Sequence, residues 1–256
     1  MNNLLRAEWY KLQRNKIFTV LLVSIAGLSA LLHYLIIIDW WQMNDTVFDR
    51  VGLGALDALL TFTVPLFFNL IVSTLAGFFI ATEFSNSGVI KNQIISGHHR
   101  SHVYVAKYVV FSFAAIVVTC LVPLFTGLIE VVVLGQSERI DLSHFLYLGR
   151  AYSLFIIHFL GYSAIIMLLA IVTEDSGKTI ILSVLMTIAI ELMRLFSSSS
   201  RFVTFIYEHT IFSQFSYVFH EGMSIDEIVQ SIIVGGITII VMISCGILLF
   251  NRKEIK

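Results

Sequence analysis

A few residues of this chain have the types that could do chemistry, but their spacing does not support it. Ser176-Gly177-Lys178-Thr179 ends like a phosphate-binding loop. That loop requires a glycine five residues before Gly177, and Val172 occupies the position. We therefore predict that this chain has no nucleotide site of its own.

Two further groups of residues have suitable types for a metal site or a catalytic pair, but the sequence does not support either. His98, His99 and His102 have no Cys, Asp or Glu beside them, whereas zinc needs four ligands in a fixed geometry. Ser163 and His158 could in principle form a nucleophile and its base, but only their closeness in sequence supports that. The sequence predicts no catalytic residue, no metal and no cofactor, and so no enzyme.

The elements around these residues are those of a membrane protein. The chain has 256 residues, of which 57% are apolar and 13% charged, where soluble domains have about 25% charged residues. Cys120 and Cys245 both lie in apolar runs and indicate buried apolar positions rather than a redox pair. This composition excludes an ordinary soluble enzyme, a disordered chain and a disulfide-stapled domain, and nothing in it suggests binding to nucleic acid.

Six runs without Asp, Glu, Lys or Arg follow one another, and five are long enough to cross a bilayer core as helices. The fifth run in chain order is short, and it can span only if it includes Glu191 and Arg194, which share a helix face and can neutralise each other. We predict an all-α membrane protein with a single transmembrane domain over 1–256. The expected spans are 17–38, 59–82, 105–130, 150–173, 178–196 and 227–250.

Polar residues and prolines inside these spans are the candidates for a pathway. Charged groups in a bilayer are costly and usually face the protein interior, which selects Glu83, Glu130, Glu191 and Arg194. Pro65 and Pro123 each remove a backbone donor, so we expect kinks in the second and third spans.

The basic residues set the orientation. One side of the membrane receives most of them, and the positive-inside rule makes that side cytoplasmic, with both termini on it. These residues are Arg6, Lys11, Arg14, Lys16, Lys91, Arg100, Lys107, Lys178, Arg252, Lys253 and Lys256, against Arg50, Arg139, Arg150, Arg194 and Arg201 on the other side. Residues 3–15 carry an apolar stripe of Leu5, Trp9 and Leu12, which predicts an amphipathic helix in the headgroup layer.

Two segments outside the spans carry further signals. In 83–104, Gly88 and Gly97 bracket a short helix with Val89, Ile90, Ile94 and Ile95 on one side. Ser85 or Ser87 can cap its start, and Gly97 can end it. Its apolar side needs burial either on a partner protein or on the chain's own cytoplasmic ends. Aromatic residues in 197–226 predict short amphipathic helices before the last span.

Taken together, these pieces resemble the permease subunits of bacterial ABC type-2 exporters. The resemblance lies in Leu5–Leu12 followed by Arg14-Asn15-Lys16, and in Glu83-Phe84, Gly88-Val89-Ile90-Lys91-Asn92, Gly97, Arg100, Tyr104 and Lys107. It implies that the first cytoplasmic loop holds a coupling helix that docks on an ATPase. The residues assigned to that helix are Ser87, Gly88, Val89, Ile90, Lys91, Asn92, Ile94, Gly97 and Arg100.

The resemblance also implies partners and a cargo. Two cytoplasmic ATPase subunits would bind ATP and magnesium, and a second permease chain, identical or similar, would complete a pathway lined by the second and fifth spans. Small permeases of this kind serve lantibiotic immunity, bacitracin resistance or peptide-toxin export in the bacterial cell membrane. A membrane scaffold or sensor without transport is the alternative, and an intramembrane hydrolase is a third class.

Overall fold

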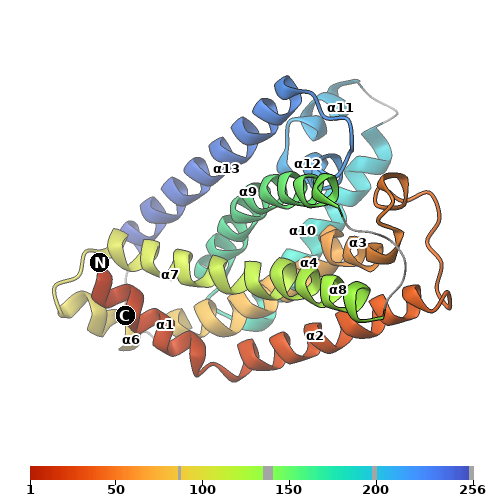
Figure 1. Ribbon diagram of the computed structural model, residues 1–256. Coiled ribbons are helices and arrows are strands. Elements are labelled where there is room, and N and C mark those ends of the chain that lie inside the picture. Colours follow the sequence, from red (N-terminus) through yellow and green to blue (C-terminus); the bar gives the residue numbers. More distant parts are fainter. Residues whose placement is uncertain (86–87, 135–140, 198–200, 254–256) are drawn as a thin grey trace.

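The computed structural model describes residues 1–85, 88–134, 141–197 and 201–253, and in these residues it contains helices and no strands. Long helices run back and forth between two ends of a bundle (Figure 1). The α-helices are α1 (Asn2–Gln13), α2 (Lys16–Ile37), α3 (Ala58–Thr63), α4 (Pro65–Ala76), α5 (Thr82–Ser85), α6 (Gly88–Ile95), α7 (Arg100–Ile116), α8 (Val122–Val133), α9 (Leu142–Thr173), α10 (Ser176–Ser197), α11 (Arg201–Glu208), α12 (Ile211–Tyr217) and α13 (Ile225–Arg252). Short 3₁₀ turns occupy η1 (Asp49–Val51) and η2 (Gly54–Leu56), and π-helical turns occupy η3 (Gly77–Ala81) and η4 (Val117–Leu121). The all-α prediction is confirmed for this part of the chain.

One end of the bundle, which we call the termini end, gathers α1, α5, α6, the start of α7 and the end of α13 (Figure 1). α1 packs on α7. The guanidinium of Arg100, at the start of α7, donates hydrogen bonds to the carbonyls of Phe250 (3.2 Å), Asn251 (3.0 Å) and Lys253 (2.6 Å). Both ends of the described chain therefore lie at the same end of the bundle. The opposite end holds η1, η2, the end of α8, α11 and α12.

Five helical segments are long and apolar enough to cross a membrane. They are Lys16–Ile37, Pro65–Ser85, Arg100–Val133, Leu142–Thr173 and Ile225–Arg252. α10 is not among them, although its 22 residues also run from the termini end to the opposite end (Figure 1). The helices extend a few residues beyond most of the predicted spans, because helical hydrogen bonding continues past the apolar run until a cap ends it.

Polar side chains fix where three of the long helices begin. Asn15 Oδ1 accepts hydrogen bonds from the amides of Ile17 (2.9 Å) and Phe18 (3.2 Å) at the start of α2. Asp141 at α9 and Ser224 at α13 form capping boxes with the residues three positions on. These caps satisfy amides that have no partner inside the helix.

The two prolines act differently from the predicted kinks. At Pro65 the helix is broken, because Val64 is extended (φ −69°, ψ 127°) and separates α3 from α4. A simple kink in the second span was therefore the wrong prediction. Pro123 lies in the first turn of α8, directly after the π-helical turn η4. Pro123 thus lies within the continuous segment Arg100–Val133, where a π-helical turn precedes the missing backbone donor.

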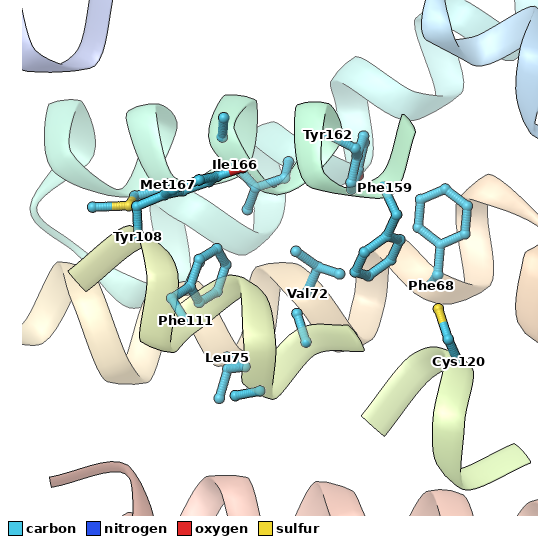
Figure 2. Close-up of a cluster of buried hydrophobic side chains, with 14 of the residues drawn as sticks. Phe68, Val72, Leu75, Tyr108, Phe111, Cys120, Phe159, Tyr162, Ile166 and Met167 are labelled. Carbon is cyan, nitrogen blue, oxygen red and sulfur yellow. The ribbon is translucent and has the colours of Figure 1, made fainter. Parts of the chain in front are cut away.

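The core lies where α4, α7 and α9 meet. Figure 2 shows Phe68 of α4 beside Phe159 and Tyr162 of α9, with ring centroids 5.6 and 5.0 Å apart. The Tyr162 hydroxyl donates a hydrogen bond to the Asn69 side chain, so this phenol has a partner in the apolar interior. Edge-on aromatic contacts of this kind favour one packing arrangement over others.

α13 packs against α9 and α7 along a face of small residues. A Cβ atom added at Gly246 would overlap the hydroxyl and ring of Tyr104 on α7. The absence of a side chain at this position therefore allows the close approach of the two helices.

We predict that Gly246→Ala destabilises the protein by about 1–3 kcal/mol, the usual cost of overpacking a filled site. The measurement is the thermal unfolding midpoint in detergent. Gly236→Ala is the matched control, since a Cβ there meets nothing within 4 Å and alanine favours the helix. An unchanged midpoint for Gly246→Ala would contradict the close contact between α7 and α13.

Candidate functional site

The segment bracketed by Gly88 and Gly97 is the short helix α6 at the termini end. Gly97 has φ +88°, a left-handed conformation that glycine adopts without strain, and its amide donates to the carbonyl of Ile94 (3.0 Å). The prediction that Gly97 ends the helix is confirmed. Ser85 donates its hydroxyl back to the carbonyl of Thr82 (3.1 Å) in α5, and Ser87 lies outside the described residues.

The apolar residues of α6 do not share one face, as the sequence had suggested. Ile90 is 1% exposed and Ile94 packs partly buried on the same core. Val89 is 39% exposed and Ile95 is 72% exposed. The sequence left open whether the apolar residues are buried on a partner or on the chain itself. Ile90 and Ile94 pack on the chain's own helices, whereas Val89 and Ile95 stay uncovered. Gly88, Lys91 and Asn92 are exposed alongside that second pair.

Four charged side chains form a cluster beneath α6, which we call the ion-pair cluster: Glu8, Lys11, Glu83 and Lys107. Lys107 Nζ lies 3.0 Å from Oε1 and 3.1 Å from Oε2 of Glu8, and it also pairs with Glu83. Lys11 Nζ lies 2.8 Å from Glu8 Oε1 and 3.0 Å from Glu83 Oε1. The side chains of Glu8 and Lys107 are each 1% exposed. The cluster joins α1, α5 and α7 with two negative and two positive charges.

Gln93 attaches α6 to the ion-pair cluster. Its side-chain amide donates to Glu8 Oε1 at 2.8 Å. Glu8 thus accepts hydrogen bonds from three elements, through Lys11 of α1, Lys107 of α7 and Gln93 of α6. Because a buried carboxylate is costly unless it is paired and hydrogen-bonded, the position of α6 is tied to the position of α1.

The titration of the cluster follows from opposing effects. Burial raises the pKa of Glu8, but attraction to Lys107 and Lys11 and the hydrogen bonds outweigh it, so the net pKa is lower than the ordinary 4.5. Burial lowers the pKa of Lys11, but attraction to Glu83 and Glu8 outweighs that and places the pKa above the ordinary 10.5. Both groups are therefore charged across the physiological pH range.

Sequence reasoning missed most of this cluster. The stripe of Leu5, Trp9 and Leu12 predicted for lipid contact stays a prediction, whereas the positions of α1 that are buried within the bundle are Leu4, Glu8 and Leu12. Glu8 lies at i+4 from one leucine and i−4 from the next, so it shares their helix face. Lys11, which the sequence analysis used only to set the orientation, pairs with Glu8 and Glu83 in the cluster. One feature of the sequence indicated a buried ion pair: Lys107 lies just inside the predicted third span, where a charged side chain needs a partner.

Three more of the residues singled out from the sequence lie at this end of the bundle: Arg100, Glu83 and Lys91. Arg100 caps the end of α13 and so ties the last long helix to the turn after α6. Glu83, predicted as a pathway candidate, lies in the ion-pair cluster. Lys91 is exposed on α6.

At the opposite end, a cavity of about 700 Å³ lies between the α3–α4 break and α10. Glu191 and Arg194 both line it, and Arg194 Nε lies 2.7 Å from Glu191 Oε2, the pairing that the sequence predicted. Most of the other lining side chains are apolar. They include Leu60, Val64, Pro65, Leu66, Ile188, Leu192, Leu195, Phe212 and Phe219. Glu130 of α8 is not among the lining residues, and its Oε2 is buried without a hydrogen-bond partner in the described residues.

The other motifs have structural roles in the described residues. Asp175 accepts a hydrogen bond from the Lys178 amide (2.7 Å) and so starts α10, which explains the sequence that ends like a phosphate loop. His158 contacts Ser231 (2.8 Å), whereas Ser163 donates to the carbonyl of Phe159 (2.8 Å), so no serine–histidine pair forms between them. The described residues contain no group of three or more His, Cys, Asp or Glu side chains able to hold a metal ion.

Five helical segments long and apolar enough to span, with the buried Glu8–Lys107 pair at one end of the bundle, define a multi-pass helical membrane protein. A family model described as "ABC-2 family transporter protein" matches residues 4–194. The chain belongs to this family, whose members are membrane transport components that generally work with an ATPase partner. No curated protein and no solved structure matches the chain.

The ion-pair cluster makes a prediction about pH. The contribution of Glu8 to stability is complete above its ordinary pKa of 4.5 and is lost as the pH falls through its lower pKa in the folded state. The contribution of Lys11 is complete below 10.5 and is lost as the pH rises through its higher folded pKa. We expect Glu8→Gln to lower the thermal midpoint at pH 7 and to weaken the dependence of that midpoint on pH below 4.5.

The measurement is the unfolding midpoint from acid to neutral pH for wild type and Glu8→Gln. Glu208→Gln, an exposed acid of α11 at the opposite end, is the control and should follow the wild-type curve. Parallel curves for wild type and Glu8→Gln would show that the carboxylate of Glu8 is not held by the cluster.

Proposed function

We propose that this chain is the membrane-spanning permease subunit of an ATP-driven exporter and that α6 is the helix on which a separate ATPase acts. The observation that carries the proposal is the split surface of α6. Ile90 and Ile94 hold it to the bundle, while Val89 near its start and Ile95 at its end remain exposed. Membership of the ABC-2 family supports the same assignment.

The partner would be a cytoplasmic ABC ATPase in two copies, which would supply the site for ATP and magnesium. The exposed surface that it would contact consists of Val89, Lys91, Asn92 and Ile95. An apolar pair flanked by polar residues is typical of a small protein-docking surface. The hydrogen bond from Gln93 to Glu8 gives a push on α6 a direct route to α1 and α7.

The proposed setting is a bacterial plasma membrane crossed six times, with α10 as the additional span and both termini in the cytoplasm. In support, 22 helical residues extend about 33 Å, close to the thickness of a bilayer core. The concentration of Lys and Arg in the segments at the termini end supports the orientation. The two charges in the last turns of α10 pair with each other, which lowers the cost of placing them near the membrane.

The proposed cargo is an amphipathic peptide or a similar hydrophobic compound, as in lantibiotic immunity or bacitracin resistance. The cavity at the α3–α4 break supports this choice, because apolar side chains surround one ion pair there. A second permease chain would face the same two segments, which belong to the second and fifth predicted spans. Irregular backbone at membrane depth is tolerated where it lines such a cavity.

The docking proposal predicts the behaviour of a surface variant. Val89→Asp with Ile95→Asp leaves Ile90 and Ile94 in place, so the fold is kept while both exposed apolar side chains of α6 are lost. Each lost apolar contact removes about 1.5–3 kcal/mol, and 1.4 kcal/mol is tenfold in affinity. We expect at least a tenfold lower recovery of the ABC ATPase when the tagged permease is purified from native membranes in mild detergent.

Ile225→Asp is the matched control, because Ile225 is 79% exposed at the first residue of α13 and lies at the other end of the bundle. It should recover the ATPase at the wild-type level. Equal recovery by the double variant would exclude docking on α6. A wild-type preparation without any ATPase would favour the alternative of a membrane scaffold or sensor.

A further inference from the structure

α2 contacts the rest of the bundle chiefly through α8, and a histidine lies in that contact. His33 of α2 is fully buried, and its ring lies over Gly127 of α8. A Cβ at Gly127 would overlap Nε2 and would lie 2.8 Å from Cδ2, so only glycine leaves room for the ring. The Nε2 atom of His33 therefore faces α8.

The hydrogen bonds of His33 leave one nitrogen unsatisfied. Nδ1 lies 2.8 Å from the carbonyl of Ser29, and because a carbonyl only accepts, Nδ1 carries the proton. Within the described residues, Nε2 has no partner. On the same α2–α8 contact, Oε2 of Glu130 is also buried without a partner in that part of the chain.

Glu130 is within reach of His33. It lies three residues after Gly127, so the two positions share a face of α8 about 5–6 Å apart between Cβ atoms. Helical side chains lean toward the N-terminus of their helix, which directs Glu130 back over the turn that contains Gly127.

We propose that His33 and Glu130 form a hydrogen bond across the α2–α8 contact and hold one proton between them. A neutral imidazole with Nδ1 protonated offers a bare acceptor at Nε2, and a carboxyl group offers an O–H donor. In this arrangement the pair has no net charge, which satisfies two atoms that a bilayer leaves unsolvated.

The pair would add a polar tie between α2 and α8, the element that α2 contacts most. In this structure the two atoms are not bonded to each other. The inference concerns α2 and α8 only and does not depend on export or on an ATPase partner.

Infrared spectroscopy of the purified chain in lipid nanodiscs at neutral pH tests the proposal. Wild type should show the carbonyl stretch of a hydrogen-bonded protonated carboxyl, and Glu130→Gln should lose it. His33→Phe removes the acceptor, so the same band should move to the higher frequency of a carboxyl without a hydrogen bond or disappear as the proton is lost. Wild-type folding of each variant is checked by its thermal midpoint.

His158→Gln is the matched control, because His158 is also buried in a span but bonds Ser231. It should leave the band unchanged. The proposal is overturned if wild type and Glu130→Gln have the same carboxyl bands, or if His33→Phe leaves the band as it was. Each of these outcomes is independent of whether the protein exports anything.

Discussion

A buried ion pair between Glu8 and Lys107, joined by the partly exposed Glu83 and Lys11, lies at one end of this bundle. Glu8 and Lys107 are almost fully covered, and Glu83 and Lys11 close the set. Removing one partner of a buried pair costs about 3–5 kcal/mol, because the remaining charge has no water to replace it. This requirement fixes α1, α5 and α7 relative to one another more strictly than apolar packing alone, since apolar side chains tolerate small slips that hydrogen bonds between charges do not.

The consequence for α6 is that an eight-residue helix acquires a fixed position. A helix of this length is marginal by itself, so its order comes from contacts with the rest of the chain. Those contacts are Ile90 and Ile94 on the apolar side and Gln93 on Glu8. Arg100, a few residues later, grips the end of α13. A force applied to the exposed side of α6 is therefore transmitted to α1, α7 and α13.

The sequence allowed the broad layout to be predicted, because long apolar runs report the cost of burying charge in a bilayer. It also located the end of α6, because Gly97 is a residue that tolerates the left-handed turn found there. The cluster could not be predicted, since Glu8 and Lys107 are 99 residues apart and only the packing of α1 on α7 brings them together. The burial of Glu8 could not be predicted either, because glutamate is rarely buried unless it is paired, and Lys107, Glu83 and Gln93 come from distant parts of the chain. At Pro65 the sequence predicted a kink, because proline lacks a backbone N–H donor. Whether the helix bends or breaks there depends on the neighbouring helices.

Hydrogen–deuterium exchange in α6 tests most directly whether the cluster holds this helix. The comparison is between wild type and Lys107→Met, with Lys91→Met, an exposed lysine of α6, as the control. The account predicts that Lys107→Met accelerates exchange in 88–97 and in α1, while α12 at the opposite end exchanges as in wild type. Unchanged exchange in 88–97 would contradict the account, because α6 would then be held without the buried charges.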